Sequence, residues 1–66
     1  MEIKMYSVRD SKGEIYNQPL FLRSHGDAER FIETMLRKNP DELPGWYANL
    51  SRFPEDFDLY YLGSIS

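Results

Sequence analysis

A single apolar stripe of helical spacing constrains the fold of this chain more than any other feature of its sequence. Five apolar residues fall at positions i, i+3, i+4, i+7 and i+8: Ala28, Phe31, Ile32, Met35 and Leu36. This spacing predicts an amphipathic α-helix that packs its apolar side against another element. Ser24 is placed to cap its start, and Asn39-Pro40 should end it, because the residue before a proline disfavours helical backbone.

Three further segments have the composition of strands. Ile3 to Val8 and Phe57 to Ile65 carry alternating apolar side chains, which indicates extended chain. Ile15 to Arg23 is a third candidate, and Pro19 should make it an edge strand or break it, because proline cannot donate a ladder hydrogen bond. The turn-forming residues 10–13 separate the strand at residues 3–8 from the candidate at residues 15–23. This arrangement predicts that these two segments form an antiparallel pair.

Residues 41–56 are the least regular part of the sequence. Prolines and a glycine interrupt this stretch at Pro44, Gly45 and Pro54. The stretch also contains Trp46 and Tyr47, whereas disordered linkers are poor in aromatic residues. We therefore predict an ordered loop, within which residues 46–50 could form one helical turn.

These elements predict a single α+β domain over residues 1–66. The order is β-β-α-β, which favours a small three-stranded sheet with one amphipathic helix packed on one face. A chain of 66 residues buries only about 60% of its unfolded surface, and this one has no cysteine to form a disulfide. Association with a partner is a usual source of the missing stability, so we expect a homo-oligomer.

The charge balance limits which partners are plausible. Eight basic residues against 11 acidic ones give a net charge of -3, which argues against strong binding of nucleic acid through phosphates alone but leaves room for a local basic patch. No apolar run approaches the length of a membrane span, and the first residues lack the pattern of a secretory signal. A cytoplasmic protein without a membrane partner is therefore expected.

Nothing in the sequence assembles a recognisable catalytic or metal site. There is no phosphate loop, dinucleotide motif, EF-hand or zinc motif. His25 is the one histidine and is best interpreted as a solvent-facing residue at the helix start, with a base or metal ligand as the alternative. The acidic cluster Glu55, Asp56 and Asp58 is best interpreted as a turn before a strand, with Mg²⁺ binding as the alternative. We expect no enzyme activity, cofactor or small-molecule substrate.

Two groups of residues are candidate contacts for single-stranded DNA or a protein. The first is a basic set near or on the helix: Arg23, Arg30, Arg37 and Lys38. It could reach phosphates or an acidic partner, although a solvated helix face is the simpler interpretation. The second is the set of strand tyrosines, of which Tyr60 is the leading candidate. Exposed rings on a sheet can stack on bases, and the alternatives are a core or a dimer interface.

Three blocks of sequence resemble a known family. They are Lys4-Met5-Tyr6-Ser7-Val8-Arg9-Asp10-Ser11-Lys12, then Gln18-Pro19-x-Phe21 with Ser24-x-Gly26-Asp27-Ala28-x-Arg30-Phe31, and finally Pro54-Glu55-Asp56-Phe57-x-Leu59-Tyr60-x-Leu62-Gly63. In this order they are similar to the nonstructural protein of gokushoviruses, members of the Microviridae, which is the phage ORF5-type family. Asp27 stands where that family usually has glutamate, and residues 39–52 do not align.

The resemblance implies a small, non-enzymatic protein made in the cytoplasm of the infected bacterial host. It further implies a role in the replication or packaging of a single-stranded DNA genome, with a phage or host replication protein as a partner. The alternative is a homo-oligomeric protein-interaction module that binds a host or phage protein and no nucleic acid.

Overall fold

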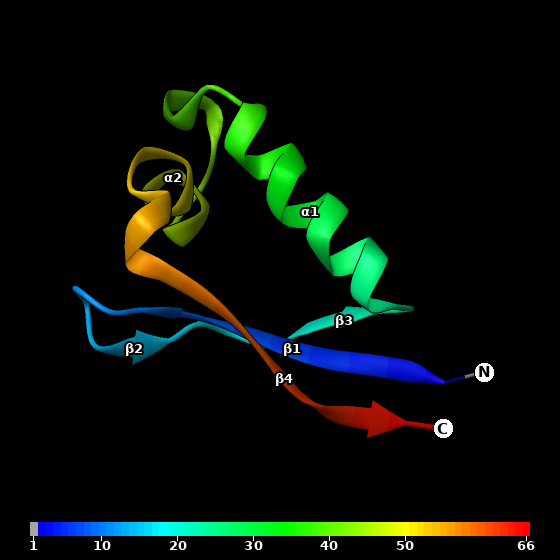
Figure 1. Ribbon diagram of the computed structural model, residues 1–66. Coiled ribbons are helices and arrows are strands. Elements are labelled where there is room, and N and C mark those ends of the chain that lie inside the picture. Colours follow the sequence, from blue (N-terminus) through cyan, green and yellow to red (C-terminus); the bar gives the residue numbers. More distant parts are fainter. Residues whose placement is uncertain (1) are drawn as a thin grey trace.

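The computed structural model describes residues 2–66 and consists of one sheet with helices on one of its faces (Figure 1). The strands are β1 (Ile3–Asp10), β2 (Ile15–Tyr16), β3 (Leu20–Leu22) and β4 (Phe57–Ile65). The α-helices are α1 (His25–Arg37) and α2 (Trp46–Arg52), and single 3-10 turns cover Pro40–Glu42 and Pro54–Asp56. The predicted α+β class is confirmed. None of the helices in the described part of the chain is long and apolar enough to cross a membrane.

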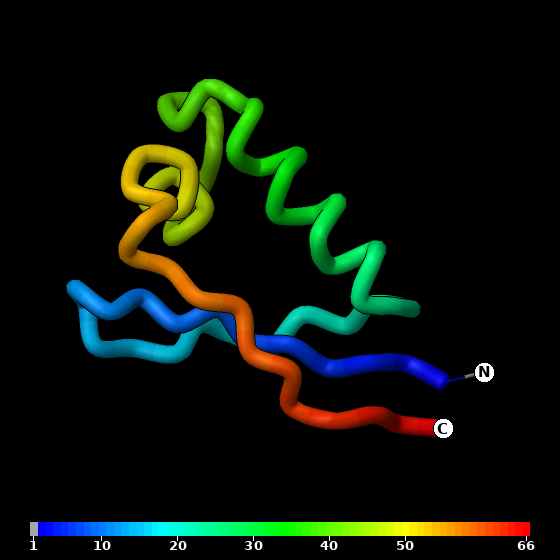
Figure 2. The backbone as a smooth tube through the Cα atoms, viewed as in Figure 1, coloured from blue at the N-terminus to red at the C-terminus, as the bar shows by residue number. Residues whose placement is uncertain are grey.

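Strand β1 lies at the centre of the sheet. β4 pairs with one of its edges along the whole strand, from Ile3 opposite Ile65 to Asp10 opposite Phe57. β2 and β3 both pair with the other edge, and every pairing is antiparallel. In Figure 2 the start of β1 and the end of β4 accordingly lie beside each other.

The segment predicted as one strand from Ile15 to Arg23 is two short strands, so the sheet has four strands instead of three. The break falls at Asn17, Gln18 and Pro19, as the missing N–H of Pro19 leads one to expect. Asn17 holds the interruption in place, because its backbone N–H and its side-chain amide both donate to the carbonyl of Val8 at 3.0 Å. Ser7 Oγ in turn donates to the carbonyl of Asn17 at 2.8 Å.

Strand β4 has the predicted bounds but an irregular end. Its register with β1 shifts between Tyr6 and Met5, which pair with Tyr61 and Gly63 respectively, so Leu62 is the extra residue of a bulge. Gly63 adopts a φ of 141°, a conformation that residues with a Cβ rarely adopt. The regular part of the strand therefore runs from Phe57 to Tyr61.

Helix α1 begins and ends close to the predicted positions. Ser24 is the N-cap, and its Oγ accepts a hydrogen bond from the backbone N–H of Asp27 at 3.1 Å. At the other end, the N–H of Lys38 donates to the carbonyl of Met35 before Pro40. Of the apolar stripe, Ala28 is fully buried, whereas Leu36 stays 40% exposed.

Residues 41–56 are ordered, and the helical turn suggested for residues 46–50 is present but longer than expected, because Trp46–Arg52 forms helix α2. The chain enters this helix through Gly45, which has a φ of 54° that few other residues tolerate. α2 packs against α1, with the rings of Tyr47 and Phe31 5.9 Å apart and edge to face. A helix of seven residues makes less than two turns, so its sequence carries no recognisable period.

The core between the sheet and the helices is small. Within residues 2–66, the apolar side chains that are fully buried are Tyr6, Val8, Ala28 and Leu50. They come from the central strand and from both helices, so the core lies where β1 passes under α1 and α2. No layer formed by residues 2–66 covers the opposite face of the sheet (Figure 1).

Candidate functional site

The uncovered face of the sheet, called the open face below, carries three aromatic side chains around β1. Tyr6 and Val8 point to the helices, so Met5, Ser7 and Arg9 between and beside them point to the open face. Residues directly opposite one another in a sheet share a face. Phe21 is opposite Met5, Tyr60 is opposite Ser7, and Tyr16 and Asp58 are opposite Arg9 on its two sides. Strand pairing thus gathers on one surface side chains that lie up to 55 positions apart in the sequence, from Met5 to Tyr60.

The aromatic rings of the open face are accessible. Phe21 is 58% exposed, Tyr16 57% and Tyr60 41%. The rings of Tyr16 and Tyr60 meet edge to face with centroids 5.6 Å apart. The guanidinium carbon of Arg9 lies 5.6 Å from the Tyr16 centroid, which is a cation–π distance.

This arrangement has the parts of a stacking surface, although little net charge accompanies it. Exposed rings on a sheet can stack on unpaired bases, and an arginine beside them can stack or neutralise a phosphate. Arg9 is opposite Asp58 in the sheet register, so the two formal charges on this surface cancel. Binding here would depend on stacking and apolar contact much more than on phosphate neutralisation.

The basic candidates Arg23, Arg30, Arg37 and Lys38 lie elsewhere, beside and on α1. Arg23 Nε contacts the Asp27 carboxylate at 3.0 Å, and Arg30 lies 3.9 Å from the same carboxylate. Arg37 is 3.9 Å from Glu33. Since α1 covers the other side of the sheet, the structure does not bring these residues together with Tyr60.

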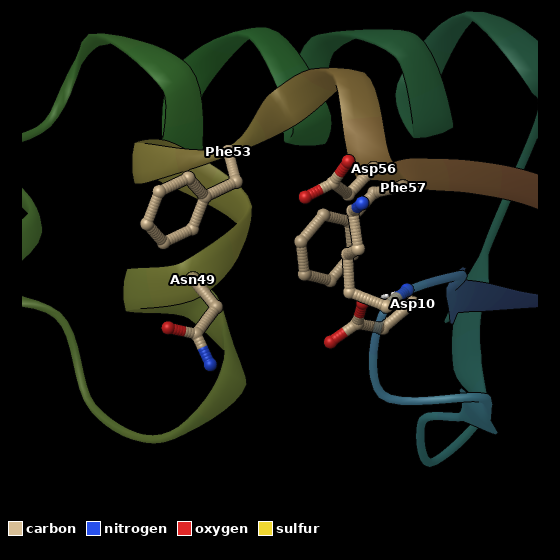
Figure 3. A pocket seen from close by; sticks show the side chains of 6 residues that line it. Asp10, Asn49, Phe53, Asp56 and Phe57 are labelled. Atoms are coloured by element: carbon tan, nitrogen blue, oxygen red, sulfur yellow. Dashed lines mark hydrogen bonds between the residues drawn. The ribbon is translucent and has the colours of Figure 1, made fainter.

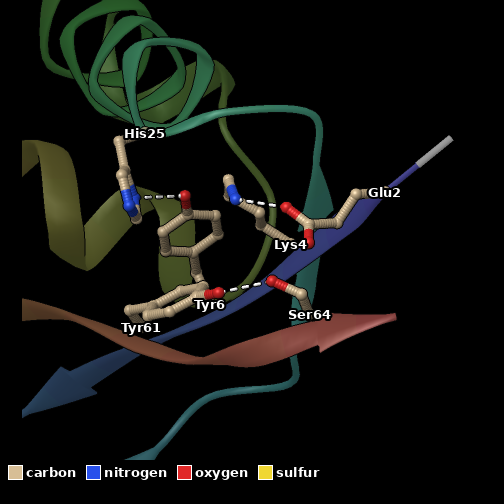
Figure 4. Close-up of polar contacts among 6 residues, drawn as sticks. All are labelled: Glu2, Lys4, Tyr6, His25, Tyr61 and Ser64. Carbon is tan, nitrogen blue, oxygen red and sulfur yellow. Dashed lines mark hydrogen bonds and ion pairs between the residues drawn. The ribbon is translucent and has the colours of Figure 1, made fainter. Parts of the chain in front are cut away.

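The tyrosines that the sequence grouped together separate into two environments. Tyr16 and Tyr60 are on the open face, whereas Tyr6 is buried under α1 and Tyr61 is beside it on the same side. Tyr6 OH is hydrogen-bonded to His25 Nδ1 at 2.6 Å, and the His25 ring is edge-on to both tyrosines (Figure 4). His25 is exposed, as predicted, and its contacts with the two tyrosines also help to fix the start of α1 over the sheet.

Burial raises the pKa of the Tyr6 phenol above its ordinary value, and the nearby Tyr61 and Asp27 act in the same direction, against Lys4. A pKa that is higher in the folded state means that the stability from this group is complete below the ordinary tyrosine pKa. It is lost as pH rises through the folded pKa. We therefore expect the denaturant concentration at the unfolding midpoint to decrease as the pH is raised from neutral to above about 10.

Tyr6→Phe is the matched control for this pH dependence, because phenylalanine keeps the ring and has no proton to lose. The decline of the denaturant midpoint with alkaline pH should be smaller in Tyr6→Phe than in the parent protein. An equal decline in both proteins would show that the Tyr6 phenol does not contribute to it.

A shallow cavity of about 300 Å³ lies between the β1 turn and α2 (Figure 3). Two carboxylates, those of Asp10 and Asp56, line it together with Lys12. Asp10 Oδ1 already accepts the backbone N–H groups of Lys12 and Gly13 at 3.0 and 3.1 Å, as expected of a turn initiator. Across residues 2–66, no three side chains of the kinds that bind metals come together.

Sequence reasoning missed two residues of the open face, Arg9 and Phe21. Arg9 lies beyond the predicted end of the first strand at Val8, and β1 extends to Asp10. Phe21 follows the break at Pro19, so the alternation of the preceding strand does not assign its face. The pairing of Phe21 with Met5 shows that Phe21 points to the open face, but this pairing cannot be derived from the sequence alone.

The chain was compared with families, curated proteins and solved structures. A family model described as "Phage ORF5 protein" matches residues 3–65, which is nearly the whole chain. No curated protein and no solved structure matches it.

Proposed function

The chain belongs to the phage ORF5 protein family, and from this premise we propose that it is a non-enzymatic accessory protein of a gokushovirus-like phage. It acts in the cytoplasm of the infected bacterium, in replication or packaging of the single-stranded DNA genome. The family is not a known enzyme family, which agrees with a role in binding. The resemblance in three ordered blocks of sequence supports the assignment to gokushoviruses.

The observation that carries this proposal is the open face with its exposed rings. Tyr16, Phe21 and Tyr60 lie on the three strands that flank β1, on one uncovered face of the sheet, and Arg9 lies over the ring of Tyr16. Single-stranded DNA fits this surface, because its unpaired bases can stack on rings while the backbone stays in solvent. Each stacked base contributes about 1–3 kcal/mol, so a few rings support weak to moderate binding.

The salt dependence of binding identifies the surface that is used. For single strands, the slope of log K against log salt is about −0.7 per neutralised phosphate. The open face offers one arginine, so we expect a slope near about −0.7. Contact through Arg23, Arg30, Arg37 and Lys38 would neutralise several phosphates and would give a slope several times steeper.

Tyr60→Ala should weaken binding of a labelled single-stranded oligonucleotide by about tenfold, because one stacked base is lost. Tyr60 is 41% exposed, so its loss should leave the fold intact. The measurement is fluorescence anisotropy at two salt concentrations. Tyr60→Phe is the matched control and should bind like the parent, because the ring is retained.

A double variant, Arg30→Ala with Arg37→Ala, tests the helix surface in the same titration. We expect it to change affinity little, because both guanidiniums lie on the far side of the sheet from Tyr60 and near carboxylates. Loss of binding in the double variant, with none in Tyr60→Ala, would move the DNA contact to α1. No binding of the parent protein at low salt would refute the contact with single-stranded DNA.

A protein partner is the second candidate, and the charge distribution favours it. The net charge is -3, the open face is neutral, and the helix arginines lie near acidic side chains. A neutral, aromatic surface with one arginine is typical of protein interfaces. A phage or host replication protein, or another copy of the chain, would then take the place of DNA.

A further inference from the structure

The two edges of the sheet differ sharply in how well they are protected. The edge formed by β2 and β3 is interrupted at residues 17–19, and Pro19 has no N–H to offer. The edge formed by β4 is one strand of nine residues, and within residues 2–66 no strand pairs with its outer side. Its outward backbone groups are a template for another strand.

The composition of β4 lacks the residues that usually prevent such pairing. Natural edge strands are protected by lysine, proline, inward-pointing charges or very short length. β4 contains neither lysine nor proline, and Asp58 is its one charged residue. The bulge at Leu62 limits regular pairing to Phe57–Tyr61, which is still as long as a typical strand.

The exposed apolar surface of the molecule is concentrated on the same strand. Of the ten large apolar side chains that are well exposed in residues 2–66, five belong to β4: Leu59, Tyr60, Tyr61, Leu62 and Ile65. Each is roughly half exposed, so together they offer on the order of 500 Å². The backbone edge of β4 adds further area. The sum of side-chain and backbone area approaches the roughly 800 Å² that each partner contributes to a standard interface.

We propose that β4 is a dimerisation edge, at which two copies of this chain pair their β4 strands antiparallel about a twofold axis. The two four-stranded sheets then become one continuous sheet with all helices on the same side. An antiparallel edge is complementary to itself, because each copy supplies the donors and acceptors that the other lacks. The Asp58 residues of the two copies lie opposite each other only if the twofold axis passes through residue 58. Any other register avoids repulsion between these two carboxylates.

The dimer also joins the two open faces. Tyr60 lies on β4 and points to the open face, so pairing at this edge brings the aromatic surfaces of both copies next to each other. The stacking surface then continues from one copy to the other without any change in the fold of either copy. Dimerisation itself does not depend on whether this surface binds DNA or protein.

A basic peptide is the main rival occupant of this edge. On the helix side of β4, Ile32 and Leu59 line a groove of about 370 Å³ with Glu29 and Glu33, so an added strand with lysines would find acidic groups nearby. Salt distinguishes the two occupants. Pairing of two copies brings like charges closer and should not weaken as salt is raised, whereas binding of a basic peptide should weaken.

Sedimentation equilibrium of the parent chain over a wide concentration range tests the proposal directly. The parent should show a reversible monomer–dimer equilibrium that is unchanged or stronger at higher salt. Leu62→Lys adds a charge at the exposed edge and removes an apolar contact, so it should weaken dimerisation by about tenfold or more. Phe21→Lys is the matched control, because Phe21 is similarly exposed, at 58% against 51% for Leu62, but lies on the opposite edge of the sheet.

Three results would overturn the proposal. These are a parent chain that stays monomeric at every concentration, a Phe21→Lys variant that is impaired as much as Leu62→Lys, and dimerisation that falls steeply with salt. Circular dichroism of both variants establishes that they are folded. The failure of this proposal is distinguishable from failure of the DNA contact, since Tyr60→Phe and Tyr60→Ala report on DNA while Leu62→Lys reports on self-association.

Discussion

Tyr6→Ala is expected to remove most of the stability of this protein. Tyr6 is 2% exposed and is one of the two largest fully buried side chains in residues 2–66. Truncating a buried aromatic side chain to alanine costs about 3–5 kcal/mol, because contacts are lost and a cavity remains. A domain of this size has about 3–10 kcal/mol in total, so the variant should be largely unfolded or melt far below the parent.

The position of Tyr6 explains why the effect should be so large. Its ring lies between β1, the start of α1 and the end of β4, and contacts both His25 and Tyr61. The hydroxyl also holds His25 at the first turn of α1. Loss of the ring therefore loosens the helix and both long strands together.

Two control variants separate the contributions of the Tyr6 ring and hydroxyl. Tyr6→Phe keeps the ring and removes the hydrogen bond to His25, so it should cost only about 0.5–1.5 kcal/mol. Tyr16→Ala removes a tyrosine that is 57% exposed and should cost far less than Tyr6→Ala. Thermal and denaturant unfolding, at one fixed protein concentration, measure all three, since any dimer makes stability depend on concentration. Equal losses in Tyr6→Ala and Tyr16→Ala would show that the core is misplaced.

Leu50→Ala is the second variant with a large expected effect, about 2–5 kcal/mol of stability. Leu50 is 2% exposed and is the residue through which α2 reaches the core. It lies close to Val8, Ile32 and Phe57 around a small groove, so it joins α2 to α1 and to both long strands. Its truncation should detach α2, which is too short to be stable without packing.

Leu36→Ala is the matched control, since it makes the same chemical change at a helix residue that is 40% exposed. We expect it to cost much less than Leu50→Ala, because 40% of the Leu36 surface is already in water in the parent, whereas Leu50 is almost completely buried. Hydrogen exchange provides a second measurement, in which the amides of α2 should lose protection in Leu50→Ala before those of β1. Equal effects of the two leucine variants would contradict the assignment of α2 to the core.

The candidate site was only partly accessible from the sequence. Tyr60 could be identified because it is an aromatic residue in a strand of clear alternation. Arg9 and Phe21 could not, because Arg9 lies beyond the predicted strand end and Phe21 belongs to a strand of three residues that shows no period. The basic residues of α1 could be placed on one helix, but their pairing with Asp27 and Glu33 is a matter of side-chain geometry.

The sequence by itself determined the elements whose signals are local. These are the two long strands, the capped helix α1 and the break at Pro19. Each follows from spacing, capping or backbone restriction within a few residues. Tertiary contacts did not override these local preferences. The α+β class then followed from the order of these elements.

Only the tertiary structure decided which face of the sheet is covered and that the helical turn suggested at residues 46–50 is a helix over residues 46–52. Both faces of β1 and β4 carry apolar or aromatic side chains, so alternation defines two faces without saying which one is buried. Tyr6 and Tyr60 look alike in the sequence and have opposite environments in the fold. Helix α2 is too short to show a period, and it exists because Leu50 is buried against elements distant in sequence. Long-range packing supplied both answers.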